Sequence, residues 1–103
     1  AEKSWGPFTV IDNQENSKTI KIEMKPNTEM SYHSHSSRTE IWNIVSGTGK
    51  ACINGEYKVV NAGDVIQIPI NTRHNIKAYE KMEIIEIQLG DIIKVTDKSK
   101  YEM

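Results

Sequence analysis

Alternation of polar and apolar residues runs through most of the chain and predicts short β-strands. Residues 18–24 carry an apolar side chain at every second position, which puts Ile20, Ile22 and Met24 on one face of an extended segment. Residues 40–45 are rich in β-branched and aromatic side chains, which pack well on a pleated sheet. The same pattern predicts a short polar strand over residues 30–35 and further strands over residues 50–53, 57–60, 65–68 and 82–89.

The longest apolar run, residues 82–89, fits a strand or a short helix. Its Met, Glu, Gln and Leu residues favour a helix, but its isoleucines and its length favour a strand, which we predict. Alternation then puts Glu86 and Gln88 on one face of the strand. The opposite face is entirely apolar, and we expect it to point to the core: Ile85, Ile87 and Leu89.

Turn residues separate the strands at intervals of about eight to twelve residues, which is typical of an all-β sandwich or barrel. Asn54-Gly55 is the strongest of these signals, because both positions of a tight hairpin turn need a positive φ. We predict one domain over residues 4–96. Residues 91–96 fit a short final strand or a turn, and we expect residues 97–103 to form a charged, loosely held C-terminal tail.

Composition and charge narrow the classes of function. The 103 residues suffice for one domain with one core. No apolar run reaches the roughly 20 residues that cross a bilayer, so we expect no membrane partner. A formal net charge of −1 gives no field for binding nucleic acid. Cys52 is the single cysteine, so no internal disulfide can form, and we expect a buried thiol and a cytoplasmic protein.

The three histidines of the chain stand where chemistry is expected. His33 and His35 are separated by one residue in an extended segment, so both imidazoles point to the same side. Glu40 begins the next strand, after a polar connection that lets its carboxylate approach them. His74 lies far away in sequence, in a loop that opens another strand. Two surface histidines would give the same His-x-His pattern, so the pair alone does not establish a metal site.

Three neutral imidazoles and one carboxylate form a ligand set for a divalent metal ion. Such a set leaves one or two coordination positions for water or substrate, which distinguishes a catalytic ion from a structural one. Imidazole and carboxylate ligands suit several first-row metals. We take Zn as the first candidate for the cofactor and leave Mn, Fe, Ni and Co open. The predicted metal ligands are His33, His35, Glu40 and His74.

The spacing of these residues resembles the two sequence motifs of the cupin superfamily. The first motif joins a glycine, the His-x-His pair, a glutamate and a second glycine at set intervals, and in this chain it runs from Asn27 to Gly47. The second runs from Gly63 to Ala78, with Asn71 in place of a glycine. Asparagine tolerates the left-handed backbone angles of glycine better than most residues, so the two asparagines fit. The resemblance implies an all-β cupin, a double-stranded β-helix or jelly-roll-like barrel, with a bound metal ion.

Within the cupins, the chain resembles the C-terminal domain of type II mannose-6-phosphate isomerases, which is often fused to a mannose-1-phosphate guanylyltransferase. The likeness covers nearly the whole chain. Because no Gly-rich nucleotide-binding loop precedes the predicted barrel, we expect a stand-alone isomerase-like domain or a piece of a longer protein. The segments that carry the likeness are Trp5-Gly6, Lys25-Pro26, Arg38-x-Glu40-x-Trp42, residues 45–49 and Glu86-Ile87-Gln88.

The resemblance implies an enzyme, an intramolecular oxidoreductase that interconverts mannose 6-phosphate and fructose 6-phosphate, or a similar pair, through an enediol. A divalent ion would polarise the carbonyl, and an acid–base group must reach C1 and C2 of the sugar. On this likeness the candidate catalytic residues are Glu86 and Arg73, and the candidate substrate-binding residues are Arg38, Trp42 and Gln88.

Each of these candidates has a structural alternative. Glu86 and Gln88 fit two solvated polar positions as well as the mouth of a barrel. Arg38 fits a surface ion pair. Trp42 fits the core, because a tryptophan buries a large apolar area.

Three positions beside the predicted site depart from the isomerase family. Ser37 and Ile41 stand where family members often carry histidine, and Asn75 stands where an arginine often follows the histidine of the second motif. Without that arginine, the family's usual contact with the phosphate group of the sugar is lost. Arg73 lies two residues away and offers a substitute cation. A small-molecule sugar phosphate stays the expected partner, with its identity open.

Two other functions are open. A non-catalytic cupin would bind metal or sugar without turning over any sugar phosphate. A dioxygenase cupin would need the same ligands, would depend on its metal and would consume oxygen. The Trp-Gly start and the Arg-x-Glu-x-Trp and Glu-Ile-Gln segments favour the sugar-phosphate family. On resemblance we also expect a homodimer that pairs through edge strands.

Overall fold

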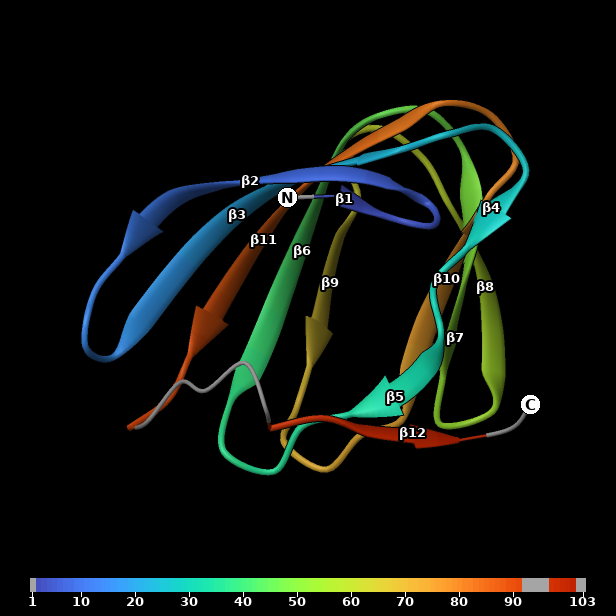
Figure 1. The fold of residues 1–103 in the computed structure, drawn as a ribbon. Helices are drawn as coiled ribbons and strands as arrows, with labels where there is room; N and C mark the ends of the chain where they lie inside the picture. The colour runs from blue at the N-terminus through green and yellow to red at the C-terminus, as the bar shows by residue number, and fades with distance from the viewer. Residues whose placement is uncertain (1, 92–96, 102–103) are drawn as a thin grey trace.

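The computed structural model describes residues 2–91 and 97–101, whose regular structure consists of strands in two facing sheets (Figure 1). The first sheet contains β1 (Glu2–Lys3), β2 (Gly6–Asn13), β3 (Ser17–Met24), β11 (Met82–Leu89), β6 (Thr39–Ser46) and β9 (Val65–Ile68), in that order. The second contains β12 (Ser99–Tyr101), β5 (Tyr32–Ser34), β10 (His74–Ala78), β7 (Gly49–Ile53) and β8 (Glu56–Val60), with β4 (Thr28–Glu29) beside β10.

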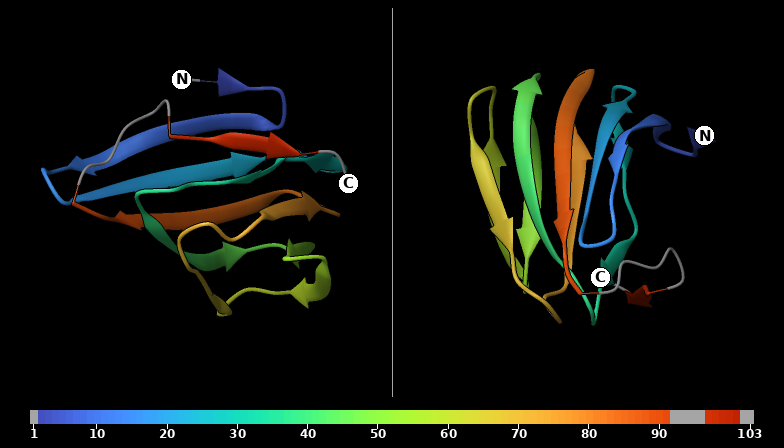
Figure 2. Two further views of the ribbon diagram at one scale, coloured as in Figure 1. Left: turned by 90° about the horizontal axis from the view of Figure 1, so that it is seen from below. Right: turned by 90° about the vertical axis from the view of Figure 1, so that its left-hand side faces the viewer.

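The chain passes between the two sheets several times, which joins them into a barrel. The chain changes sheet after β3, β5, β6, β8, β9, β10 and β11, so neighbouring strands are often far apart in sequence. The longest pairing is of this kind: β3 and β11 lie antiparallel over their whole length (Figure 2), from Ser17 opposite Leu89 to Met24 opposite Met82. Within residues 2–91 and 97–101 no helix could span a membrane.

The interior of the first sheet changes character along its strands. The register of β3, β11 and β6 sets side chains in successive layers. The layer at one end is polar, and we call this end the mouth: Lys18, Gln88 and Glu40. The next layer is mixed: Ile20, Glu86 and Trp42. The layers at the other end are apolar, and we call this end the base: Ile22, Ile84, Ile44, Met24 and Met82.

Apolar burial at the base holds the two sheets together. Met82 and Ile84 have no exposed surface, and Ile76 and Ala78 of β10 face them from the second sheet with none either. Burying one such large side chain contributes about 1.5–3 kcal/mol. Cys52 is also buried, as a free thiol, which confirms the prediction made for it.

Asparagines take left-handed backbone angles at three turns. Asn54 and Gly55, with φ of 49° and 81°, connect β7 to β8 and confirm the predicted hairpin. Asn27 and Asn71, with φ of 60° and 58°, occupy the two motif positions where glycine is usual. The backbone there needs a positive φ, which asparagine adopts more readily than other side chains do.

Most predicted strands are confirmed, and one long strand was missed. The predicted segments 18–24, 40–45, 50–53, 57–60, 65–68 and 82–89 lie within β3, β6, β7, β8, β9 and β11, and β5 occupies the middle of the segment 30–35. No strand was predicted over Gly6–Asn13. This strand, β2, has a bulge between Val10 and Asp12, and Val10 and Ile11 are both exposed. The bulge breaks the alternation on which the prediction depends.

The predicted core face of β11 is wrong. Ile84, Glu86 and Gln88 are buried, whereas Leu89 is exposed and Ile85 and Ile87 are half-buried on the outer face. The physical reason lies in the other strands, because the inward face of β11 must match the layers on β3 and β6. Its first half fills the base with apolar groups and its second half reaches the polar mouth, so the face that is apolar throughout points outward.

Residues 97–101 of the predicted tail are attached to the barrel. Ser99 and Tyr101 lie opposite Ser34 and Tyr32 as β12 pairs with β5. Asp97 Oδ1 and Oδ2 accept hydrogen bonds from the backbone amides of Ser36 and Ser37, both at 2.8 Å. This part is therefore not loosely held. The expectation of a strand or turn over residues 91–96 falls largely outside the described residues.

Candidate metal centre

Strand pairing brings the three histidines together. His74, at the start of β10, lies directly opposite His33 of β5, and their ring centroids are 4.3 Å apart. His35 follows the end of β5, and its ring centroid lies 4.9 Å from that of His33 and 5.3 Å from that of His74. All three are buried. They form a group that can hold a metal ion.

Backbone carbonyl groups set the orientation of each imidazole. A carbonyl oxygen only accepts, so each Nδ1 carries the hydrogen and each Nε2 keeps a lone pair, as in metal-ligating histidines. Burial, followed by the charge of His74, lowers the pKa of His33 to about 3, so that ring is neutral near pH 7. The Nδ1-to-carbonyl pairs are His33 with Ser31 at 2.6 Å, His35 with Asp97 at 2.5 Å and His74 with Thr72 at 2.8 Å.

The carboxylate of Glu40 faces the histidines from the first sheet. Its Oε2 lies 3.1 Å from His35 Nε2, and its Oε1 lies 3.4 Å from His74 Nε2. Arg38 donates to Oε2 from Nε and Nη2, at 3.0 and 2.9 Å, and its Nη2 lies 3.1 Å from His35 Nε2. If His35 Nε2 bound a metal ion, Arg38 would lose its contact with that nitrogen and keep its contact with Glu40.

Two buried acceptors indicate that a cation fits here. Glu40 Oε1 and His74 Nε2 have no hydrogen-bond partner among the described residues, although they face each other across 3.4 Å. With the hydrogen of His74 on Nδ1, neither atom has one to share, and an unpaired buried acceptor costs about 1–3 kcal/mol. The ligand atoms of the three histidines lie within 4.8 Å of one another. One ion placed among them would contact all three residues.

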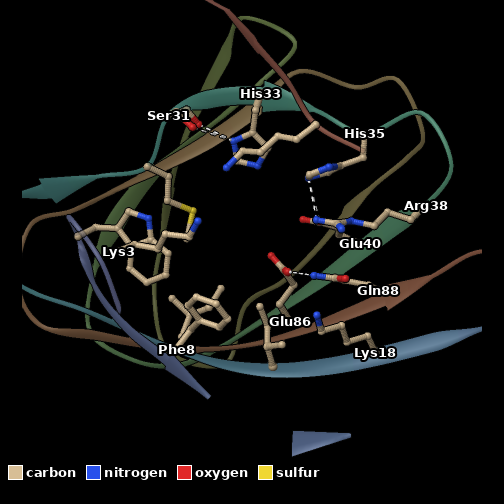
Figure 3. A pocket seen from close by; sticks show the side chains of 15 residues that line it. Lys3, Phe8, Lys18, Ser31, His33, His35, Arg38, Glu40, Glu86 and Gln88 are labelled. Carbon is tan, nitrogen blue, oxygen red and sulfur yellow. Dashed lines mark hydrogen bonds and ion pairs between the residues drawn. The ribbon is translucent and has the colours of Figure 1, made fainter. Parts of the chain in front are cut away.

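Two of the three histidines, His33 and His35, open into a cavity at the mouth of the barrel (Figure 3). His33, His35 and Glu40 lie in one part of its wall, and Glu86 and Gln88 project from β11 toward the same space. Water molecules can occupy about 170 Å³ of the cavity. This volume has room for about ten waters, at roughly 15 Å³ each, or for one small organic molecule.

Glu86 is a buried carboxyl group with unusual basicity. Trp42 Nε1 donates to its Oε1 at 2.8 Å, and Gln88 Nε2 donates to its Oε2 at 2.7 Å. Burial, followed by the charge of Glu40, raises the pKa of Glu86 to about 8 despite these donors. A carboxyl group that titrates near neutral pH beside a cavity has the properties of a general acid–base group.

The structure brings some of the other predicted site residues to the cavity and not others. Arg38 and Gln88 lie in its wall with Glu86. Trp42 is fully buried and outside the wall, where it contacts Glu86 rather than the cavity. Arg73 is exposed and also outside the wall, and its guanidinium carbon lies 3.9 Å from the centroid of the Tyr101 ring. The roles predicted for these residues in catalysis and substrate binding stay predictions.

Two features of the site were missed by sequence reasoning. Asp97 holds His35 through a backbone carbonyl, a group that every residue has, so no residue type marks this role. Lys3, Lys18 and Lys98 lie in the cavity wall and come from three distant segments. No motif joins them, and only the strand topology brings them to one place.

Comparison with protein families decides what the chain is related to. The model of the family described as mannose-6-phosphate isomerase C-terminal matches residues 1–103. The chain belongs to this family. A relative of this isomerase-family domain, named putative mannose-1-phosphate guanylyltransferase from Vibrio cholerae serotype O1, is 35% identical over 102 residues. The match covers 97% of this chain and 22% of the relative, so the domain spans about a fifth of the relative's length.

Solved structures show the fold of the isomerase-family domain. An uncharacterized conserved protein with a double-stranded β-helix domain from Klebsiella pneumoniae subsp. pneumoniae has a TM-score of 0.84 at 16% identity, over 100% of this chain and 90% of that one. Salicylate 1,2-dioxygenase from Pseudoaminobacter salicylatoxidans has a TM-score of 0.73 at 15% identity, over 79% of this chain and 24% of that one. At these identities the likeness shows the fold alone. The predicted all-β cupin fold and family are confirmed.

Proposed function

We propose that this domain is a metal-dependent isomerase that interconverts an aldose phosphate and a ketose phosphate, such as mannose 6-phosphate and fructose 6-phosphate. One observation carries the proposal: Glu86, with its pKa raised to about 8, lines the same cavity as His33, His35 and Glu40. The reaction needs a Lewis acid and an acid–base group on one substrate. Membership of the isomerase C-terminal family supports the substrate class.

His33, His35, Glu40 and His74 would hold the ion. Bound there, it would supply Lewis acidity toward the oxygens at C1 and C2 of the open-chain sugar. The protein contributes preorganisation, because three contacts with backbone carbonyl groups hold the Nε2 lone pairs inward before any ion binds. Nitrogen and oxygen donors suit Zn, our first candidate, and also Mn, Fe, Ni and Co.

Glu86 would carry the proton between the two carbons. In the aldose-to-ketose direction its carboxylate takes the hydrogen of C2 as a proton and returns it to C1, while the hydroxyl proton of O2 passes to O1. With a pKa of about 8, about one tenth of the group is ionised at pH 7, and this fraction is a stronger base than an ordinary glutamate. Trp42 and Gln88 hold the two carboxyl oxygens in position.

Proton exchange in deuterated water tests the proposal. The domain, loaded in turn with each candidate metal, is incubated with mannose 6-phosphate and, separately, with fructose 6-phosphate, and the products are followed by NMR. Deuterium is expected at C2 of the aldose and at C1 of the ketose. Glu86→Gln should slow exchange by about 10²- to 10⁴-fold. Glu83→Gln, on the same strand and paired with Lys21, is the matched control and should not change the rate.

Two results would overturn the isomerase. Absence of exchange with every metal and either sugar phosphate would leave a binding protein without turnover. Oxygen consumption that depends on added iron would indicate a dioxygenase instead, although the likeness to salicylate 1,2-dioxygenase extends to the fold alone. Exchange at wild-type rate in Glu86→Gln would keep the isomerase and remove Glu86 from its mechanism.

A further inference from the structure

Cationic side chains gather at the cavity although the chain as a whole is slightly acidic. Its formal net charge is −1, yet the cavity wall contains Lys3 of β1, Lys18 of β3, Lys98 beside β12 and Arg38 before β6. Figure 3 shows Lys3, Lys18 and Arg38 on different sides of the space. These residues come from four segments of both sheets, so the fold gathers positive charge around one opening.

The three lysines have no acidic partner of their own. Among the described residues, the lysine ion pairs join Lys21 to Glu83 and Lys25 to Glu2, and none involves Lys3, Lys18 or Lys98. Arg38 differs, because Glu40 neutralises it. Lys98 also lies near Lys3, Lys100 and Arg38, and together with burial, which acts most strongly, these like charges lower its pKa. Like charges held together without a counter-charge attract an anion.

The acidic groups in the cavity wall, Glu40 and Glu86, and Asp97 beside Lys98 are already engaged. Glu40 contacts Arg38 and the histidines. The Asp97 carboxylate accepts three hydrogen bonds from Ser36 and Ser37. The Glu86 carboxyl group accepts from Trp42 and Gln88, deeper in the barrel. None of these three acidic groups forms an ion pair with Lys3, Lys18 or Lys98.

We propose that Lys3, Lys18 and Lys98 form the subsite for the phosphate group of the substrate. The position of the rest of the substrate follows from the proposed function, which puts the sugar carbonyl at the histidine cluster. Lys18 lies opposite Gln88 in the sheet, and Lys98 follows the residue whose carbonyl holds His35. Lysines, His33, His35 and Glu86 thus line one small cavity, and one molecule bound in it can contact both the lysines and the proposed reacting groups.

The charge of the subsite selects a phosphate monoester over other anionic sugars. A phosphate group carries nearly two negative charges at pH 7 and presents three acceptor oxygens, so it interacts with several cations at once. Lysine binds phosphate as a point charge and needs no fixed fork geometry, which suits three side chains on separate segments. A sugar acid offers one charge and two oxygens, and a neutral sugar offers no charge.

Calorimetric titration tests the subsite without needing turnover. The metal-free domain and the Zn-loaded domain are titrated at low salt with mannose 6-phosphate, mannose and mannuronate. The lysines are replaced singly and together by Lys3→Gln, Lys18→Gln and Lys98→Gln. A control triple variant carries Lys58→Gln, Lys77→Gln and Lys81→Gln, which make the same charge change at exposed positions outside the cavity wall. Lys18→Arg keeps the charge and should retain binding.

We expect mannose 6-phosphate to bind most tightly, with each single variant losing about tenfold in affinity and the triple variant more than a hundredfold. The control triple variant should stay within about twofold of wild type. The subsite is refuted if the triple variant binds like wild type, if the control loses as much, if mannuronate binds as tightly as mannose 6-phosphate, or if wild type binds no mannose 6-phosphate.

The two proposals fail separately. Binding of mannose 6-phosphate that depends on the lysines, without any proton exchange, would refute the isomerase and keep the subsite. Proton exchange with a KM that is the same in wild type and in the triple lysine variant would keep the isomerase and refute the subsite.

Discussion

At the base of the barrel, Ile84 of β11 is buried among apolar side chains; at the mouth, Gln88 of the same strand is buried between Lys18 and Glu40. The two positions are equally hidden from water but differ in what stabilises them. Apolar burial at the base stabilises the fold by itself. Polar burial at the mouth costs free energy unless each group finds a partner.

The difference between mouth and base separates residues that fold the chain from residues that bind ligands. Apolar groups of similar size at the mouth would serve the fold better than Glu40, Glu86 and Gln88 do. Three buried acceptor atoms at the mouth, one each on Glu40, His74 and Gln88, lack a partner among the described residues. We found none at the base over the same residues. The mouth is therefore built for a ligand, and changes at the two ends should have separable effects.

Removal of a metal ligand is expected to have the largest effect. His74→Ala should lower metal affinity by more than about a hundredfold, because it removes one Nε2 donor from the set. Metal analysis after gel filtration and titration with Zn would measure the loss. Thr72→Ala is the matched control, since Thr72 contacts His74 through its backbone carbonyl, which the variant keeps. Unchanged metal content in His74→Ala would contradict the metal centre.

A cavity at the base should cost stability and spare the metal centre. Ile84→Ala is expected to lower the free energy of unfolding by about 2–5 kcal/mol, because Ile84 has no exposed surface. Metal affinity of the folded variant should stay within about threefold of wild type. Chemical denaturation would measure the first and calorimetry the second. Ile85→Ala, on the half-buried outer face of the same strand, should cost clearly less; equal costs would mean that β11 faces the other way.

The raised pKa of Glu86 gives a pH dependence with a definite sign. The folded-state pKa of about 8 lies above the ordinary value of 4.5, so the folded protein holds this proton more tightly than the unfolded chain. The stabilising contribution is complete below pH 4.5 and is lost as the pH rises to about 8. The free energy of unfolding of the metal-free domain should therefore fall, relative to Glu86→Gln, between pH 5 and 8. A constant difference between the two proteins would show an ordinary pKa.

The smallest expected effect concerns the turn before β10. Asn71 has φ of 58°, and its backbone amide donates to the carbonyl of His35 at 2.8 Å. Asn71→Ala should cost about 1 kcal/mol in the free energy of unfolding, because alanine resists this angle, and Asn71→Gly should cost close to nothing. Thermal denaturation of the pair would measure both. Equal stability of the two variants would mean that the turn relaxes without strain.

The sequence predicted the base and the outline of the mouth for the same reason. Period-two alternation marks strands whose inward face is apolar, so β3 and β6 were found, and the spacing of His33, His35 and His74 reflects their positions on β5 and β10. Alternation failed where one face changes character along a strand. In β11 the inward face begins with Met82 and ends with Gln88, and no local pattern reveals such a change.

The remaining features of the site depend on contacts that residue type does not encode. The carbonyls of Ser31, Thr72 and Asp97 orient the histidines, and any residue in those places offers the same atom. Lys3 and Lys18 reach one cavity because β1, β2 and β3 lie in one order in the sheet. A motif gives the spacing of residues along the sequence, whereas these contacts depend on which strands lie side by side in the folded sheets.

The contact between His35 and Asp97 also imposes an order on biosynthesis. A ribosome releases the chain from its N-terminus, so every strand from β1 to β11, with all four proposed ligands, emerges before Asp97 does. The sheets can pair at that stage, but the His35 ring lacks the acceptor that fixes its tautomer. High-affinity metal binding is therefore expected only after Asp97 has left the ribosome. A nascent chain stalled at residue 91 should bind metal more weakly than the complete chain does.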